Sequence, residues 1–259
     1  MACSLILIGF GASLIAGLGT GLGALPALLV PRISPRLQDT LLGFAAGVML
    51  AASFFSLIVP GLAAAQSLHG NETAAALVVI AGILLGAVTL WLIHSYAPHE
   101  HFISGHEGPV TERLQRIWLF VIAITLHNIP EGLAVGVGFG GGDMENGTAL
   151  AIGIGIQNIP EGLAVAVALL SEGYARAQAL AVAVLTGLVE PVGGLVGVTA
   201  VSLAEPLLPW GLAFAAGAMI FVISNEIIPE THRHGVQVQS TFGLMIGFVV
   251  MMFLDVSLG

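Results

Sequence analysis

The sequence predicts an all-α integral membrane protein with eight transmembrane helices. Three observations support this fold class: the composition, the spacing of long apolar runs, and the positions of the arginines. Hydrophobic residues make up 57% of the 259 residues and charged residues 8%, and the mean hydropathy is +1.01. A soluble domain carries about 25% charged residues. We therefore expect lipid, rather than water, to surround most of this chain.

Long apolar runs with few charges recur from one end of the chain to the other. A transmembrane helix needs about 20 mainly apolar residues. We predict a single transmembrane domain over residues 1–259, with spans at 4–30, 40–65, 74–97, 117–140, 148–170, 177–203, 207–229 and 241–258. The sixth and seventh runs are separated only by Glu205-Pro206, which is the weakest of the breaks. The first run has no positively charged leader, so we expect it to be retained as a helix.

The arginines test this count of helices. All of them fall in the first, third, fifth and seventh connections: Arg32, Arg36, Arg113, Arg116, Arg176 and Arg233. Alternate connections share one side of the membrane, and the side rich in Lys and Arg is cytoplasmic. Eight helices with both termini outside satisfy every arginine, whereas one helix more or fewer would scatter them. The expected location is the plasma membrane (the inner membrane in a bacterium), with the loop 98–116 in the cytoplasm.

Charge and cysteine content exclude several other classes of protein. The formal net charge is −9, and all six basic residues other than histidine are arginines. Because no basic cluster is present, we expect no nucleic-acid partner. The lone Cys3 excludes a disulfide framework and a thiolate metal cluster.

A short motif occurs twice, in the fourth and fifth predicted spans. NIPEGLAV occupies residues 128–135 and again residues 158–165. Consecutive spans run antiparallel, so the two copies enter the membrane from opposite sides. This arrangement is typical of inverted repeats that meet around a site near the membrane midplane.

The repeat places carboxylates deep in the membrane. Glu131, Glu161 and Glu190 lie near the middle of the fourth, fifth and sixth spans. An ionised carboxylate at the bilayer centre costs at least about 2.5–3.5 kcal/mol on insertion scales. No arginine lies near these three residues. A bound divalent cation would compensate for their charge, and we expect a metal site here.

Side chains next to the glutamates fit the same interpretation. His127 precedes Glu131 by four residues, which puts both on one helix face, and Gln157 precedes Glu161 in the same way. Gln157 is equally well explained as a hydrogen-bonding residue between packed helices. Imidazole, carboxylate and carbonyl oxygen suit zinc, iron(II), manganese or cadmium.

Asparagines and prolines of the motif add further donors. Asn128 and Asn158 can each supply an amide oxygen from an adjacent direction. Pro130, Pro160 and Pro191 each remove a backbone donor and leave a carbonyl unpaired one turn earlier. Such backbone is tolerated at membrane depth where it lines a cavity.

At these residues the sequence resembles the ZIP (Zrt-, Irt-like) family of metal transporters, and its GufA-type bacterial branch in particular. HNIPEG followed by QNIPEG carries the resemblance, together with the eight spans and the histidine-rich third connection. The resemblance implies a ZIP-like inverted-repeat bundle, a homodimer, and an elevator-like sliding of helices one, four, five and six against the others.

The resemblance also implies a binuclear metal centre. One metal would be held by His127, Glu131, Gln157, Glu161 and Glu190. The other would be held by Asn128, Glu131, Asn158, Glu161 and Glu190. Some relatives carry Asp where this chain has Asn158, so the site here has one negative charge fewer.

Polar residues outside the midplane are candidates for further metal contacts. On the expected cytoplasmic side these are His99, His101, His106, Glu226, Glu230, His232 and His234. They can receive metal that leaves the pore, or they can be ordinary solvated residues. We expect His94 to be an interfacial histidine. Asp255 lies near the outer end of the eighth span, where relatives have an acidic residue at the entrance.

The function that we expect is transport of divalent metal, above all zinc and also cadmium, iron(II) or manganese, into the cytoplasm. One alternative is a proton or monovalent-cation pathway that uses the same glutamates. An intramembrane metalloenzyme is a second alternative, but the chain has no HExxH motif. We therefore expect no enzymatic activity.

Overall fold

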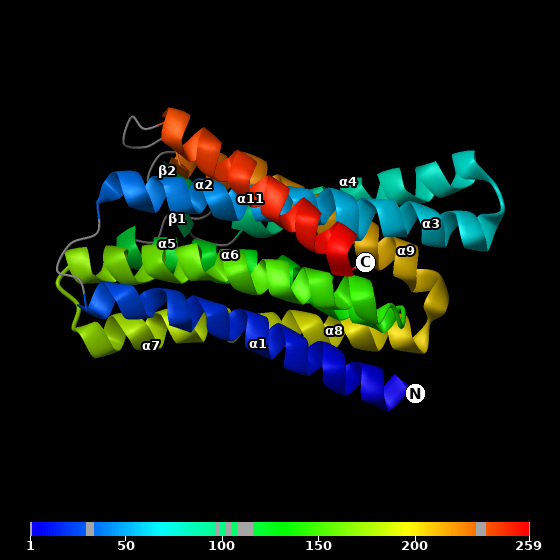
Figure 1. The fold of residues 1–259 in the computed structure, drawn as a ribbon, viewed down its shortest axis with the longest axis horizontal. Helices are drawn as coiled ribbons and strands as arrows, with labels where there is room; N and C mark the ends of the chain where they lie inside the picture. Colours follow the sequence, from blue (N-terminus) through cyan, green and yellow to red (C-terminus); the bar gives the residue numbers. More distant parts are fainter. Residues whose placement is uncertain are drawn as a thin grey trace.

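The computed structural model describes residues 2–29, 34–96, 99–101, 105–107, 116–231 and 237–258. Within these ranges, eight helical spans are long and apolar enough to cross a membrane, as predicted. They form one bundle of roughly parallel and antiparallel helices (Figure 1).

The spans are built from the following elements. They are α1 (Ala2–Leu29); α2 (Pro35–Ala52) joined through the π-helix η1 (Ser53–Ile58) to α3 (Val59–His69); α4 (Glu72–Tyr96); α5 (Arg116–Gly140); α6 (Met144–Ser171); α7 (Arg176–Gly187) followed by α8 (Glu190–Leu203); α9 (Leu208–Val222) continued by the π-helix η3 (Ile223–Ile227) and α10 (Ile228–Thr231); and α11 (Gln237–Leu258). A 3₁₀ turn, η2 (Glu205–Leu207), separates α8 from α9. Between α4 and α5 lie two short antiparallel strands, β1 (His99–His101) and β2 (Gly105–Glu107).

The second span differs most from its predicted bounds, because it extends beyond 40–65 at both ends. Ser34 caps its start: the side-chain oxygen accepts a hydrogen bond from the backbone N–H of Leu37, and Pro35 follows at the first helical position. The helix ends at Gly70, which adopts the left-handed conformation (φ 62°) that glycine tolerates best. Because these capping residues are polar or turn-forming, a prediction from hydropathy alone gives a helix that is too short at both ends.

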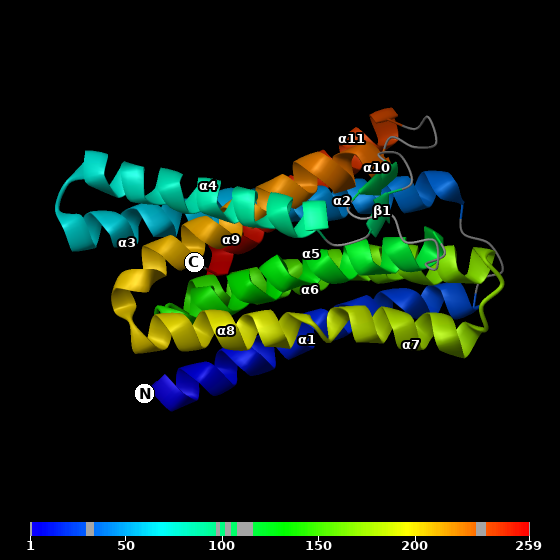
Figure 2. The ribbon, with the colours of Figure 1, turned by 180° about the vertical axis from the view of Figure 1, so that it is seen from behind.

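The sixth span is interrupted in its middle. α7 ends at Gly187 and α8 begins at Glu190, and the two segments follow one another along the bundle (Figure 2). Pro191 has no N–H to offer to the carbonyl of Gly187, which explains a break at this point. The first carboxylate of α8 therefore lies at an interruption within the membrane-spanning region.

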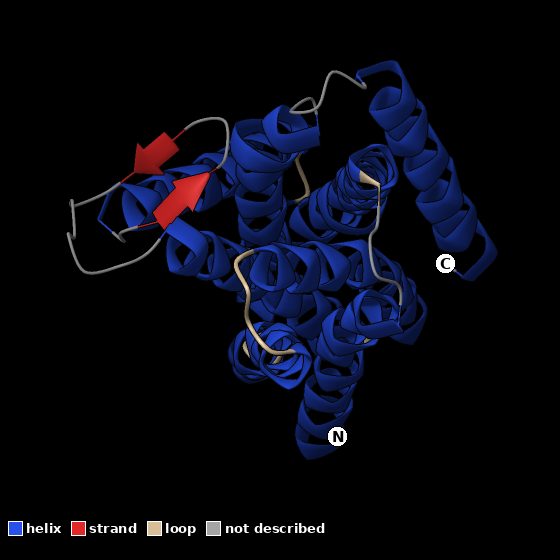
Figure 3. Cartoon of the chain, turned by 90° about the vertical axis from the view of Figure 1, so that its left-hand side faces the viewer, coloured by secondary structure: helices blue, strands red, loops and turns tan. Residues whose placement is uncertain are grey.

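Helix pairing in the bundle follows an inverted-repeat pattern. The most extensive contacts are α1 with α6, α5 with α8, α2 with α11, and α4 with α9. If the first three spans are exchanged with the last three, and the fourth with the fifth, this set of pairs maps onto itself. Viewed from the end where α2, α5 and α7 begin, the helix that ends at the C-terminus lies at the periphery (Figure 3).

Glycines bring the paired helices into backbone contact. A Cβ on Gly162 of α6 would overlap the carbonyl oxygen of Thr20 in α1, and a Cβ on Gly132 of α5 would overlap the carbonyl oxygen of Glu190 in α8. Small residues at helix interfaces permit this approach where lipid supplies no hydrophobic driving force.

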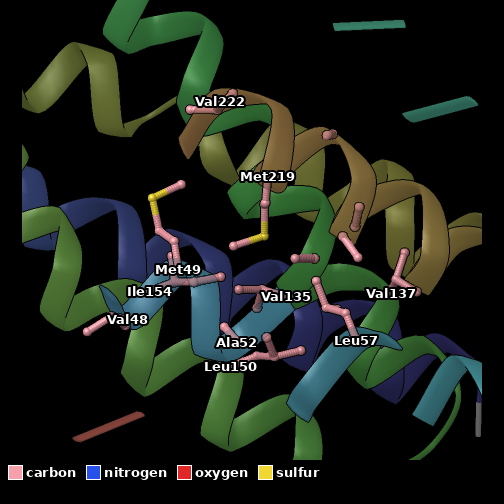
Figure 4. Packing of buried hydrophobic residues seen from close by; sticks show 14 of the residues in the cluster. Val48, Met49, Ala52, Leu57, Val135, Val137, Leu150, Ile154, Met219 and Val222 are labelled. Atoms are coloured by element: carbon pink, nitrogen blue, oxygen red, sulfur yellow. The ribbon is translucent and has the colours of Figure 1, made fainter. Parts of the chain in front are cut away.

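An apolar cluster fills the space between the two groups of helices. Met49 of α2, Ile154 of α6 and Met219 of α9 are fully buried and converge there (Figure 4). These side chains hold the α1, α5, α6, α7, α8 group against the α2, α3, α4, α9, α11 group by van der Waals packing.

We predict that Gly47→Ala destabilises the protein, because the added methyl would overlap the backbone oxygen of Leu244 in α11. Overpacking costs about 1–3 kcal/mol, so the midpoint of thermal unfolding in detergent should fall by about 5 °C. Gly11→Ala is the control, because nothing lies within 4 Å of a Cβ at Gly11. Equal midpoints for the two variants would contradict this account of the helix contacts.

Candidate metal site

Three glutamates from three helices meet inside the bundle. Glu131 of α5 and Glu190 of α8 are completely buried, and Glu161 of α6 is 1% exposed. The carboxylates are close enough to interact electrostatically. The prediction that they share one region is therefore consistent with the folded chain.

Backbone geometry explains how these side chains come together. Gly132, next to Glu131, allows the backbone of α8 to approach at Glu190. Gly162, next to Glu161, does the same for α1. The glycine that follows each glutamate in the repeated motif therefore closes the bundle around the carboxylates.

The arginine positions within the described helices are many residues away from the three glutamates. Arg36, Arg116 and Arg176 are the first or second residue of α2, α5 and α7. Those three helices begin at the same end of the bundle, whereas both chain termini point toward the opposite end (Figure 1). Among the described residues, no arginine is positioned to neutralise the glutamates.

The two asparagines of the motif are held by hydrogen bonds. Asn128 Nδ2 donates to the carbonyl oxygen of Thr186 at 2.8 Å. Asn158 Nδ2 donates to the carbonyl oxygen of Ala16 at 2.8 Å and to Glu190 Oε1 at 2.6 Å. Gln157 Nε2 donates to Asn158 Oδ1 at 3.4 Å. All three amide side chains are completely buried.

Several acceptor atoms in this cluster accept no hydrogen bond of good geometry from the described residues, although the Gln157 amide interacts with the Glu131 carboxylate. They are Asn128 Oδ1, Gln157 Oε1, both carboxylate oxygens of Glu131, both of Glu161, and Glu190 Oε2. Buried oxygens without a partner are rare, because losing hydration without compensation costs free energy. A set of seven such acceptors with no positive side chain beside it can be satisfied by a cation.

His127 connects this cluster to a second group of polar residues. It lies one helical turn before Glu131, and its Nε2 contacts Glu226 Oε2 in η3. Glu226 Oε1 lies 2.7 Å from His94 Nδ1 in α4. One ligand atom from each of His94, His127 and Glu226 lies within 4.8 Å of the others, which suits a metal ion.

His94 was predicted to be interfacial, and this prediction is wrong. The side chain is 1% exposed and lies in a polar cluster inside the bundle. Its neighbour Glu226 lies on a π-helical turn, and the pairing of α4 with α9 brings the two together. The amino-acid pattern around His94 shows neither the pairing nor the π-helical turn. The one sequence feature that marks His94 is its position at the end of a long apolar run.

A small cavity joins the two polar groups. Its volume is about 30 Å³, and Glu161, His127, Glu226 and Glu230 contribute to its lining. One water molecule needs about 10–15 Å³ of such space, so the cavity can hold water. The cavity therefore brings Glu161 and Glu230 to one space, although apolar side chains such as Phe120 and Ile124 form most of its lining.

The remaining predicted contacts lie elsewhere. Asp255, near the end of α11, accepts a hydrogen bond of 2.6 Å from Ser56 Oγ in η1. His99, His101 and His106 belong to β1 and β2, but the positions of their side chains are not described. His232 and His234 lie outside the described residues.

Comparison with known proteins now identifies the family. A family model described as ZIP zinc transporter matches residues 95–255. A relative named zinc transporter GufA, from Myxococcus xanthus, is 50% identical over 251 residues, which cover 97% of this chain and 99% of the relative. The chain belongs to the ZIP family.

Other ZIP proteins match over most of their length. Zinc transporter ZIPB of Bordetella bronchiseptica is 53% identical over 240 residues, covering 93% of this chain and 78% of the relative. Human zinc transporter ZIP11 is 36% identical over 305 aligned positions, covering 86% of this chain and 89% of the relative. The ZIP family consists of transporters rather than enzymes, which confirms the expectation that this chain is not an enzyme.

We predict that zinc stabilises the wild-type protein and not Glu161→Gln. A ligand present at 100 times its dissociation constant adds about 2.7 kcal/mol to the stability of the native state. The midpoint of thermal unfolding in detergent should rise with added zinc in the wild type and stay constant in the variant. The matched control is Glu145→Gln, at an exposed position in the first turn of α6. An undiminished zinc effect in Glu161→Gln would show that the ion binds elsewhere.

Proposed function

We propose that this ZIP-family chain carries divalent metal ions, zinc above all, across the plasma membrane into the cytoplasm. The observation that carries the proposal is the group of seven buried acceptor atoms on five side chains, which accept no hydrogen bond of good geometry within the described part of the chain. Ionisable groups at membrane depth are usually functional, and these require a positive ligand. Relatives that align along nearly the whole chain are named zinc transporters.

The donor set narrows the class of ion. Carboxylates from Glu131, Glu161 and Glu190 combine with amide oxygens and with the imidazole of His127. This mixture suits zinc, cadmium, iron(II) and manganese. Cys3, the only cysteine of the chain, belongs to α1, and no cluster of methionines accompanies the repeated motif, so copper(I) is disfavoured. We propose these four ions as substrates, with zinc preferred.

The proposed route leaves the midplane through the cavity beside His127. From Glu161 it passes Glu226 and reaches Glu230, which lies on the side where the arginines indicate the cytoplasm. His94 joins Glu226 as a contact along this route. The histidines of the third and seventh connections would receive the ion next. Asp255 would act at the outer entrance, with both termini outside.

The site of a ZIP-like binuclear centre would have two positions that share glutamates. The first position would use His127, Glu131, Gln157 and Glu161, with Glu190 nearby. Asn128 and Asn158 would lie at the second position, and the direction in which each amide points would decide whether that position is filled. Oxygen donors without described partners support the first position, since Glu131, Gln157 and Glu161 each offer at least one.

An elevator-type movement is the mechanism that we propose. The glycine contacts support it: where a glycine Cβ would overlap a backbone oxygen, both helices belong to the same group, as in α1 with α6 or α4 with α9. Glycines that face the other group meet side chains instead, such as Gly153 with Met251 and Gly211 with Val137. Interlocked backbones favour two rigid groups, and side-chain contacts between them permit sliding.

We also propose a homodimer, as the family resemblance implies. The outward faces of α4 and α11 carry exposed apolar side chains, including Leu84, Trp91, Phe242 and Phe253. Such faces suit contact with lipid or with a second copy of the chain.

The central test is zinc uptake into proteoliposomes. Glu161→Ala should reduce uptake to the level of protein-free liposomes, because it removes a carboxylate shared by both proposed metal positions. Glu145→Ala should transport like the wild type, since Glu145 is exposed and outside the site. Competition among zinc, cadmium, iron(II) and manganese in the same assay would give the order of preference. Undiminished flux of all four ions in Glu161→Ala would rule out the proposed site.

A second prediction concerns the route out of the midplane. His94→Ala should lower the rate of uptake about tenfold, as expected when a group supporting a metal pathway is lost. The zinc-induced rise in unfolding temperature should remain, since the midplane donors are intact. His69→Ala is the control, because His69 is an exposed residue at the end of α3. Loss of zinc stabilisation in His94→Ala would place this histidine in the main binding site instead.

A further inference from the structure

The two copies of NIPEGLAV have identical sequences, but their asparagines are used differently. Asn128 uses its amide nitrogen to bind the backbone of α7, and its Oδ1 has no described donor. Asn158 directs its nitrogen at Glu190 and at the backbone of α1. The first copy therefore offers an oxygen to a cation, whereas the second offers N–H groups to a carboxylate.

The orientation of the Asn158 amide is determined by its neighbours. Nδ2 lies 2.8 Å from the carbonyl oxygen of Ala16 and 2.6 Å from Glu190 Oε1, and both of these atoms are acceptors. Oδ1 receives the N–H of Gln157. If nitrogen and oxygen were exchanged, an oxygen would face two acceptors and an NH₂ would face another NH₂. Only the described orientation satisfies these three contacts.

These contacts use the whole amide. Both hydrogens of Nδ2 are donated, and Oδ1 is an acceptor already. Asn158 is completely buried, so water cannot replace a lost partner. To coordinate a metal through Oδ1, the side chain would have to rotate, which would leave Ala16 and Glu190 without their donor. Buried groups left unpaired in this way are unfavourable.

We propose that Asn158 limits the midplane site to one tightly bound divalent ion. Its amide nitrogen holds Glu190 Oε1 and occupies the side of that carboxylate where a second cation would bind. A positively polarised N–H thus takes the place of a second metal. This inference rests on the proposed function, since it assumes that a divalent ion binds among Glu131, Glu161 and Glu190.

The same arrangement makes Asn158 a determinant of how many ions bind. An aspartate at this position would have only acceptor oxygens and an additional negative charge. It could no longer donate to Glu190, and the two carboxylates would repel one another unless a cation lay between them. Asn158→Asp should therefore create a second tight metal position.

Equilibrium binding of zinc to the purified full-length protein in lipid nanodiscs tests the proposal. The bound metal is counted per chain by elemental analysis after dialysis against a fixed free concentration. We expect Asn158→Asp to hold one more tightly bound ion per chain than the wild type. Asn71→Asp is the matched control: it makes the same substitution at an exposed position before α4, outside the site, where the side-chain oxygen accepts hydrogen bonds from the backbone N–H groups of Thr73 and Ala74. We expect it to gain no ion.

Any zinc bound by the loop histidines is the same in the wild type and in every variant. The difference in bound zinc per chain between the proteins therefore decides the outcome. An equal number of ions in Asn158→Asp and the wild type would overturn the proposal, as would a gain of one ion in both aspartate variants. If Asn158→Asp does not fold, the proposal is tested by the number of zinc ions per chain that Glu161→Gln loses relative to the wild type. A loss of one ion from the wild type supports the proposal, and a loss of two overturns it. No loss at all would instead refute the proposed transport site.

Discussion

The structure depends on three carboxylates buried inside the helix bundle, where the described helices place every arginine at a helix end. Glu131, Glu161 and Glu190 are buried on three different helices, and the described arginines belong to helix ends. Burial of uncompensated charge is one of the most unfavourable arrangements in a protein. The repeated motif, the interruption between α7 and α8, and the glycine contacts all serve to assemble these groups. The divalent cation that we propose as ligand would make the assembly favourable.

The inverted repeat extends beyond the motif. The second and seventh spans, which correspond in the pairing pattern, each contain a π-helix, η1 or η3, and each π-helix is followed two residues later by a proline, Pro60 or Pro229. The two π-helices carry the polar contacts at either side of the midplane. Ser56 in η1 binds Asp255 of α11, and Glu226 in η3 binds His94 of α4. π-helical turns are frequent at functional sites, because the extra residue redirects side chains.

The repeat is nevertheless asymmetric in its chemistry. At η1 a hydroxyl contacts one carboxylate, whereas at η3 the carboxylate of Glu226 contacts two imidazoles, of His94 and His127. The two asparagines of the motif also differ: Asn128 leaves its Oδ1 without a described donor, whereas Asn158 donates a hydrogen bond to Glu190. In the transport that we propose, an ion would therefore meet different ligands at the two π-helices.

Most of the fold could be predicted from the sequence. Eight apolar runs, the alternation of arginines and the doubled motif suffice for the helix count and for the ZIP family, and both are confirmed. These features are local or periodic, so they can be read without knowledge of the tertiary contacts. The extension of the second span to residues 35–69 was missed because its ends are set by Ser34 and Gly70, which are not apolar.

The site was predicted less completely. The glutamates could be selected because a carboxylate at membrane depth is unusual in any sequence. His94 could not, since its role depends on the π-helical turn that directs Glu226 toward it. Nor could the sequence distinguish Asn128 from Asn158, because identical octapeptides surround them. What differs is the partner helix, α7 for one and α1 for the other, and that pairing is a property of the folded chain.

The most direct measurement is anomalous scattering from crystals of the wild-type protein grown with zinc. We expect an anomalous zinc peak enclosed by α5, α6 and α8, about 2.0–2.2 Å from carboxylate oxygens of Glu131 and Glu161. A map with zinc only at the histidines of the connections, and none among the three glutamates, would contradict this expectation.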